Sequence, residues 1–111
     1  MIGDKDLNIN HDGNSTPALE SLLQQAAHNI GHPSAVFKND YASGIEDDHL
    51  PFKQRGVPVL DIIDIDYGPH TAALPDGYHH TAEDTLDKLS PQSLQISGDL
   101  FLEVIRLINT K

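Results

Sequence analysis

The residues best suited to chemistry lie at positions 78–85, which read YHHTAEDT. Two adjacent imidazoles, His79 and His80, are followed by the carboxylates Glu83 and Asp84. Neutral imidazole is the commonest protein ligand for zinc, and a hydrolytic zinc site needs about three protein ligands plus an open position for water. This pattern is compatible with a metal-binding loop. On the residues alone, a solvent-exposed, structural histidine pair is the stronger interpretation.

A second polar stretch, GIEDDHLPF at 44–52, places Glu46, Asp47, Asp48 and His49 in succession. Carboxylates held close together share protons, and such pairs assist acid–base steps. Acidic residues are also favoured in the first turn of any helix by the macrodipole, so an ordinary negatively charged helix start is the alternative. We expect the two stretches to form opposite walls of one site.

Two helices should hold these stretches in place. The first is predicted over 17–30, with Thr16 as its N-cap, Pro17 at the first helical position and Gly31 after its end. The second is predicted over 91–109 and starts at Ser90-Pro91. Each shows one apolar face at helical spacing. The faces are Leu19, Leu22, Leu23, Ala26, Ala27 and Ile30 in the first helix, and Leu94, Phe101, Val104, Ile105 and Ile108 in the second, where Gly98 is expected to allow close approach to a sheet.

Residues 57–63, VPVLDII, form an almost continuous apolar run of strand length. This pattern is typical of a strand covered on both faces, as in a parallel α/β sheet. Residues 35–37 are a second, shorter strand candidate. Residues 64–77 form a loop at the carboxyl end of the main strand, where open α/β sheets bind ligands. Because the sequence offers too few strands to cover the main strand on both sides, we expect a partner sheet outside these residues.

Length and composition limit the classes of function. A chain of 111 residues predicts one domain over 1–111. Its net charge of −10 argues against nucleic acid or an anionic membrane surface as a partner. The absence of Cys excludes thiolate zinc sites, iron–sulfur clusters and disulfides. No apolar run is long enough to span a membrane, and no signal peptide is visible, which leaves the compartment open.

Three motifs together resemble the C-terminal half of the zinc-dependent exopeptidases of metallopeptidase family 28, especially the glutaminyl cyclase branch and its bacterial relatives. They are MIGD at 1–4, IEDDHLPFKQRGVPVLDII at 45–63 and HHTAEDTLDKLSP at 79–91. The resemblance implies the C-terminal portion of a three-layer α/β/α fold with a mixed, largely parallel central sheet. It also implies one or two zinc ions and a peptide N-terminus as substrate. Relatives are often exported.

The resemblance also assigns roles to individual residues. In relatives, a His followed by Thr and acidic residues binds zinc, and His80 matches that ligand. His79 stands where cyclases often have an aromatic residue, which implies a substrate-binding role for it and for Tyr78. Asp47 matches a carboxylate in the hydrogen-bond network beside the catalytic acids. Its neighbours Asp48 and His49 complete a form that favours the cyclase-like branch, since typical aminopeptidases have Ser-Asp-His there.

The same resemblance implies that ligands are missing. Relatives have an Asp directly before Met-Ile-Gly, with further ligands and a Glu-Glu pair upstream, whereas this sequence starts at the Met. We therefore expect an incomplete catalytic domain, inactive alone, that pairs with a missing N-terminal half or self-associates through an exposed sheet edge. Two alternatives stay open. One is a small non-catalytic αβ interaction module, and the other is a self-contained metal site built from His70, His79, His80 and Glu83.

Overall fold

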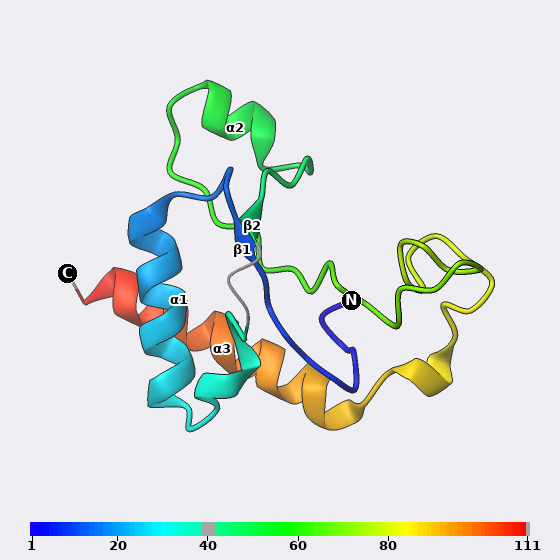
Figure 1. Ribbon diagram of the computed structural model, residues 1–111. Coiled ribbons are helices and arrows are strands. Elements are labelled where there is room, and N and C mark those ends of the chain that lie inside the picture. Colours follow the sequence, from blue (N-terminus) through cyan, green and yellow to red (C-terminus); the bar gives the residue numbers. More distant parts are fainter. Residues whose placement is uncertain (39–41, 111) are drawn as a thin grey trace.

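The computed structural model describes residues 1–38 and 42–110 (Figure 1). Two long helices, α1 (Pro17–Asn29) and α3 (Pro91–Asn109), pack against each other. A short helix α2 (Leu50–Gln54) lies apart from them, above the two short strands in Figure 1. Two-residue strands β1 (His11–Asp12) and β2 (Ala42–Ser43) pair in parallel between these parts. Turns of 3₁₀-helix occupy Pro33–Ala35 and Leu86–Lys88.

Helix α1 confirms its prediction closely, because its boundary signals are local. It begins at Pro17, ends at Asn29, and buries Leu22, Leu23, Ala26 and Ala27 against the core. The Thr16 hydroxyl does not cap it. That oxygen accepts the N–H of Val59 at 2.9 Å instead, so the start of α1 is fastened to the segment predicted as the main strand.

Helix α3 begins as predicted but turns a different face inward. The Ser90 hydroxyl caps it by accepting the N–H of Ser93 at 3.3 Å. Of the predicted apolar face only Val104 is buried, whereas Phe101 is 54% exposed and Ile108 45% exposed. The face that packs inward consists of Ser93, Ser97, Leu100, Val104 and Leu107. The helix carries apolar residues on both sides, so periodicity alone predicted the wrong side as the buried face.

The prediction for Gly98 is also wrong. A Cβ added at Gly98 would meet no atom within 4 Å, so this glycine does not mediate a close approach. It lines an apolar groove of about 440 Å³ on the exposed side of α3. The other lining residues include Ile2, Leu60, Ile62, Leu94 and Phe101.

The predicted strand at 57–63 is extended but belongs to no ladder in the part of the chain that is described. It lies beside the N-terminal segment, where the Ile63 carbonyl accepts the N–H of Asn10 at 2.9 Å and the Val59 carbonyl accepts that of Thr16 at 2.7 Å. The backbone N–H groups of Val59 and Asp61 donate to the side-chain hydroxyls of Thr16 and Ser15, where a strand in a sheet would donate to backbone carbonyls. Most of the segment is half-buried rather than covered on both faces.

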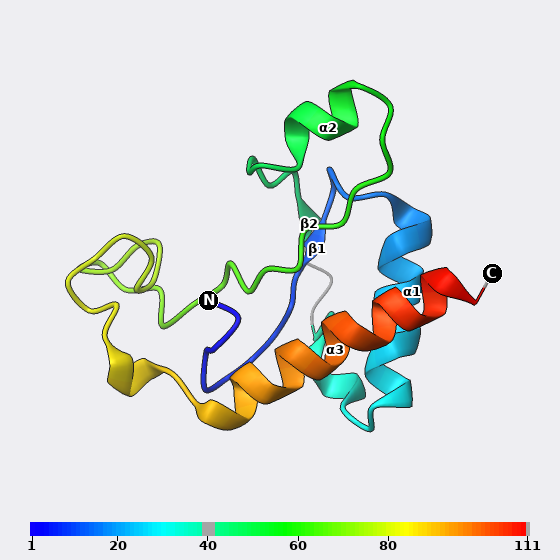
Figure 2. The ribbon, with the colours of Figure 1, turned by 180° about the vertical axis from the view of Figure 1, so that it is seen from behind.

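The second strand candidate, 35–37, is replaced by the end of a 3₁₀ turn and a single parallel bridge between Ile9 and Val36. Ile9, Leu23 and Leu100 form the centre of the core, where the two helices meet the N-terminal segment. Seen from behind, α3 runs obliquely across the lower part of the molecule and passes over α1 (Figure 2). No helix among the described residues is both long and apolar enough to cross a bilayer.

Candidate functional site

The acidic stretch 44–49 is held by one buried carboxylate, Asp12. Its Oδ1 accepts the backbone N–H groups of Asn14 at 2.9 Å and Ile45 at 2.8 Å. Its Oδ2 accepts the Ser15 hydroxyl at 2.8 Å and meets His49 Nε2 at 2.8 Å. Burial acts to raise the pKa of Asp12, but these hydrogen bonds outweigh it and lower that pKa below its usual value. Asp12 is therefore ionised at neutral pH.

His49 lies between two carboxylates. Because an ionised carboxylate only accepts hydrogen bonds, His49 Nε2 carries the proton that is shared with Asp12. On the other side of the ring, His49 Nδ1 lies 3.7 Å from Asp61 Oδ2. Both atoms are buried and lack a hydrogen-bond partner among the described residues. Burial raises the pKa of Asp61; the charge of His49 opposes this, and nearby carboxylates reinforce it.

Sequence reasoning named His49 but missed Asp12 and Asp61. A signal for Asp61 existed, because it is the single acidic residue inside the apolar run 57–63. Asp12 sits in an Asp-Gly turn, where a side chain that accepts nearby backbone N–H groups is expected. The predicted acids Asp47 and Asp48 are exposed and precede α2 rather than occupying its first turn. Asp47 accepts the N–H of Asp48 at 2.8 Å.

The histidine pair occupies a separate loop. The rings of His79 and His80 stack with their centres 3.8 Å apart. His80 is exposed, and its φ of 56° lies in the left-handed region, which non-glycine residues rarely adopt. Such conformations cost about 1–3 kcal/mol and cluster at functional sites.

Residues 68–77 form a closed loop that leads to the histidines. Its two ends meet where the N–H of Tyr78 donates to the carbonyl of Tyr67 at 2.8 Å. Gly77, with a φ of 69°, lies so close to that carbonyl that no Cβ fits. The Tyr67 hydroxyl donates to Asp84 at 2.8 Å, and burial with this bond raises the pKa of Tyr67 to about 12.

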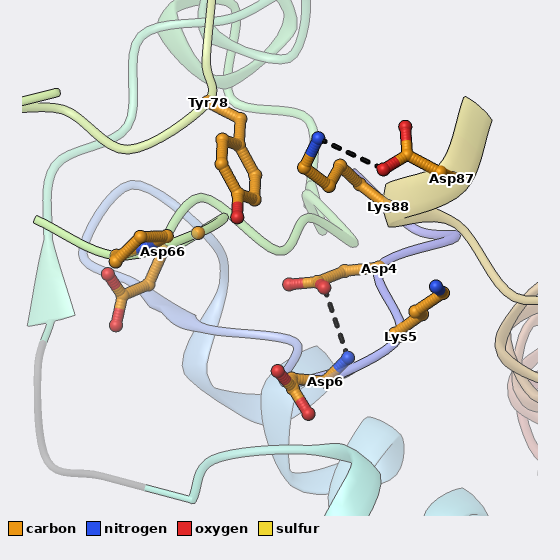
Figure 3. A pocket seen from close by; sticks show the side chains of 9 residues that line it. Asp4, Lys5, Asp6, Asp66, Tyr78, Asp87 and Lys88 are labelled. Atoms are coloured by element: carbon orange, nitrogen blue, oxygen red, sulfur yellow. Dashed lines mark hydrogen bonds and ion pairs between the residues drawn. The ribbon is translucent and has the colours of Figure 1, made fainter. Parts of the chain in front are cut away.

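Tyr78 borders a polar pocket of about 510 Å³ (Figure 3). Lys88 Nζ lies 4.8 Å from the centre of the Tyr78 ring and pairs with Asp87 at 3.3 Å. The phenol points into the pocket between Asp66 and Asp4. Ammonium, carboxylate and aromatic groups together suit a small polar ligand that carries charge.

Next to this pocket, Asp64 is fully buried. Its Oδ2 accepts the N–H of Asn8 at 3.0 Å, while its Oδ1 has no partner among the described residues. Burial, together with the neighbouring carboxylate of Asp4, raises the pKa of Asp64 to about 8. This side chain is therefore largely protonated at neutral pH.

The structure does not bring the two predicted walls together. Both views place the loop of 66–85 and the 44–54 region at separate ends of the molecule (Figures 1 and 2). The alternative metal site of His70, His79, His80 and Glu83 is not formed either. His70 pairs with Asp66, and Glu83 lies 3.7 Å from Lys88. Within the described residues, the group whose ligand atoms converge, all within 4.8 Å, is Asp12, His49 and Asp61.

The family model of peptidase family M28 matches residues 1–105. The chain belongs to peptidase family M28. Aminopeptidase YwaD of Bacillus subtilis (strain 168) is 34% identical to this M28 chain over 89 residues, which are 80% of the chain and 18% of YwaD. The crystal structure of an Acidobacteriales bacterium glutaminyl cyclase is 72% identical, with a TM-score of 0.94, and the match covers 99% of the chain.

These matches confirm the predicted family and support its glutaminyl-cyclase-like branch. The structural match covers 99% of the M28 chain. It does not confirm the predicted three-layer α/β/α arrangement with a largely parallel sheet, because the sheet in the described part consists of β1 and β2. The chain spans only 37% of the matched cyclase structure. Zinc is the metal that the family implies. His80 alone offers it one imidazole, whereas the nitrogen and oxygen donors of the Asp12 group fit a divalent ion chemically.

Proposed function

We propose that this chain is the C-terminal part of a zinc-dependent catalytic domain that acts on peptide N-termini, with His80 as one zinc ligand. The observation that carries the proposal is the 72% identity to a glutaminyl cyclase structure over 99% of the chain. Because the match covers 37% of that structure, the proposal assigns the remaining ligands and the general base to residues outside this chain. The chain alone is then inactive.

His80 suits the ligand role because its imidazole is exposed and its backbone is held in an uncommon conformation. The stacked ring of His79 fixes its orientation from one side. The hydrogen bond between Tyr67 and Asp84 fastens the loop behind both histidines to the core. Bound zinc would polarise the carbonyl under attack.

The pocket beside Tyr78 supports a peptide N-terminus as substrate. The carboxylates of Asp4 and Asp66 border it, and either can pair with a protonated α-amine. The Tyr78 ring offers a flat apolar wall to the first side chain. Asp12 accepts the N–H of Ile45 and meets the ring of His49, so the segment that carries Asp47 and Asp48 is anchored on both sides of them. This anchoring favours a supporting role for the two acids beside the catalytic acids of the complete domain.

Cyclisation is the favoured reaction. The α-amine of an N-terminal glutamine attacks its own side-chain carboxamide carbon, a new C–N bond closes the ring, and ammonia leaves. Amino-acid release by water is the second candidate, because the 34% identity to an aminopeptidase supports it. Membership of an enzyme family disfavours the non-catalytic interaction module.

The test uses the complete catalytic domain encoded by the gene. Mass spectrometry of a glutamine-initiated peptide distinguishes loss of ammonia from release of the first residue. We expect His80→Ala to lower the zinc content and to reduce turnover by at least a hundredfold, while His28→Ala, an exposed histidine on α1, changes neither. Full zinc content and normal turnover in His80→Ala would contradict the proposed ligand.

A further inference from the structure

We propose that His49 Nδ1 and Asp61 bind a divalent transition-metal ion, in a site separate from the His80 loop. The two atoms face each other at 3.7 Å, and neither has a hydrogen-bond partner among the described residues. The His49 side chain is only 8% exposed, so water does not readily satisfy it. This inference concerns residues of this chain alone and is independent of the proposed catalytic function.

Asp12 prepares His49 for this role. Because Asp12 accepts the proton on Nε2 at 2.8 Å, loss of the second ring proton leaves the lone pair on Nδ1, which faces Asp61; a metal ion binds this deprotonated form. A carboxylate that fixes the tautomer of a histidine in this way is the usual partner of a metal-bound imidazole. Asp12 itself already accepts four hydrogen bonds. It is therefore an orienting residue and not a ligand.

The spacing fits an ion between the two atoms. Zinc binds imidazole nitrogen and carboxylate oxygen at about 2.0–2.2 Å, which separates two tetrahedral ligands by about 3.4 Å. The observed 3.7 Å requires only a slightly wider angle. When the ring has lost that proton and no ion is bound, two buried lone-pair atoms face each other without a hydrogen-bond donor between them, which is unfavourable.

The charges and donor types select the class of ion. The carboxylates of Asp12, Asp47 and Asp48 all act on Asp61 electrostatically, so the surroundings are negative. Magnesium and calcium prefer all-oxygen sites, whereas zinc and related transition metals accept imidazole. Two protein ligands are fewer than the three or four of an ordinary zinc site, so the expected affinity is micromolar. Binding would link the 44–49 stretch to the extended segment at 57–63.

The experiment titrates zinc chloride into the 111-residue chain and follows the heat of binding and the imidazole nitrogen resonances of His49. We expect one equivalent to bind with a dissociation constant in the micromolar range and to shift the Nδ1 resonance, while magnesium chloride does neither. His49→Gln keeps a donor for Asp12 but removes Nδ1, so this variant and Asp61→Asn should weaken binding at least tenfold. His80→Ala should leave it unchanged.

Two outcomes would overturn the site. One is a His49 Nδ1 resonance in the unaltered chain that zinc does not shift, a measurement that does not depend on any variant folding. The other is zinc binding that survives both His49→Gln and Asp61→Asn or disappears in His80→Ala. Failure of the catalytic proposal is seen separately, in the zinc content of the complete domain with His80→Ala.

Discussion

Asp12 joins its own turn to the 44–49 stretch through one side chain. Its two oxygens connect the turn at Asn14, the backbone of Ile45 and the ring of His49. A neutral amide cannot accept all of these bonds, and it presents a donor where the carboxylate presents only acceptors. The organisation of the 44–49 stretch therefore depends on this residue.

We expect Asp12→Asn to lower the free energy of unfolding by about 2–4 kcal/mol, because it leaves buried donors unsatisfied. Urea unfolding monitored by circular dichroism measures the loss. Asp47→Asn, at an exposed position nearby, should change stability by no more than about 0.5 kcal/mol. Equal effects of the two substitutions would show that Asp12 does not organise the loop.

Asp64 gives stability a pH dependence of its own. Burial raises its pKa from the ordinary value of 3.8 to about 8 in the folded chain. Between these values the folded state keeps a proton that the unfolded state has released, so this residue's contribution to stability falls as pH rises. The contribution is complete below about pH 4 and lost by about pH 8.

Asp64→Asn imitates the protonated side chain at every pH. We expect the melting temperature of this variant to fall less between pH 5 and pH 8 than that of the unaltered chain, because the contribution of Asp64 to the fall is removed. At pH 8 the variant should be the more stable of the two. Thermal melts across that range provide the measurement. Asp99→Asn, an exposed change on α3, should keep the original slope. A D64N variant with the same slope would refute the buried, protonated carboxyl.

At the scale of elements, local signals were sufficient for the helices. Pro17 and the Ser90-Pro91 pair mark where α1 and α3 begin, since caps and first-turn prolines act within a few residues. The inward face of α3 was not predictable in the same way. Leu100 and Leu107 compete with Phe101 and Ile108, and only packing on α1 decides between them.

The same distinction applies to strands and to the site. The extended segment at 57–63 was predictable from its composition, but its neighbours are set by contacts with Asn10 and Thr16, far away in sequence. His49 stood out by its residue type. Its partners Asp12 and Asp61 come from two other segments, so no spacing in the sequence connects the three.

For the whole molecule, the exposed side of α3 and the extended segment form one apolar surface. Phe101 and Leu94 line the groove together with Leu60 and Ile62. The hydrogen bonds that hold the extended segment to the N-terminal segment come from every second residue, namely Val59, Asp61, Ile63 and Ile65. The backbone groups of the residues between them lie on the other edge of the segment, which faces away from β1. Unpaired edges beside apolar surface promote association.

We therefore expect the isolated chain to self-associate at micromolar concentrations through this surface. Phe101→Glu should shift it towards the monomer in light scattering, because a charge in the groove opposes burial. Phe52→Glu makes the same change at another exposed phenylalanine, on α2, and should have no such effect. A monodisperse monomer of the unaltered chain would instead favour the independent interaction module.

The closed loop at 68–77 has a consequence for engineering. Since the Tyr67 carbonyl and the Tyr78 N–H join its ends, the rest of the molecule is insulated from its length. Loop closure costs only about 0.6 kcal/mol for each doubling of length. A flexible epitope tag inserted between Ala72 and Ala73, both exposed, should leave the melting temperature within a few degrees. The loop thus offers a place to attach a label or tether without disturbing the histidines that follow it.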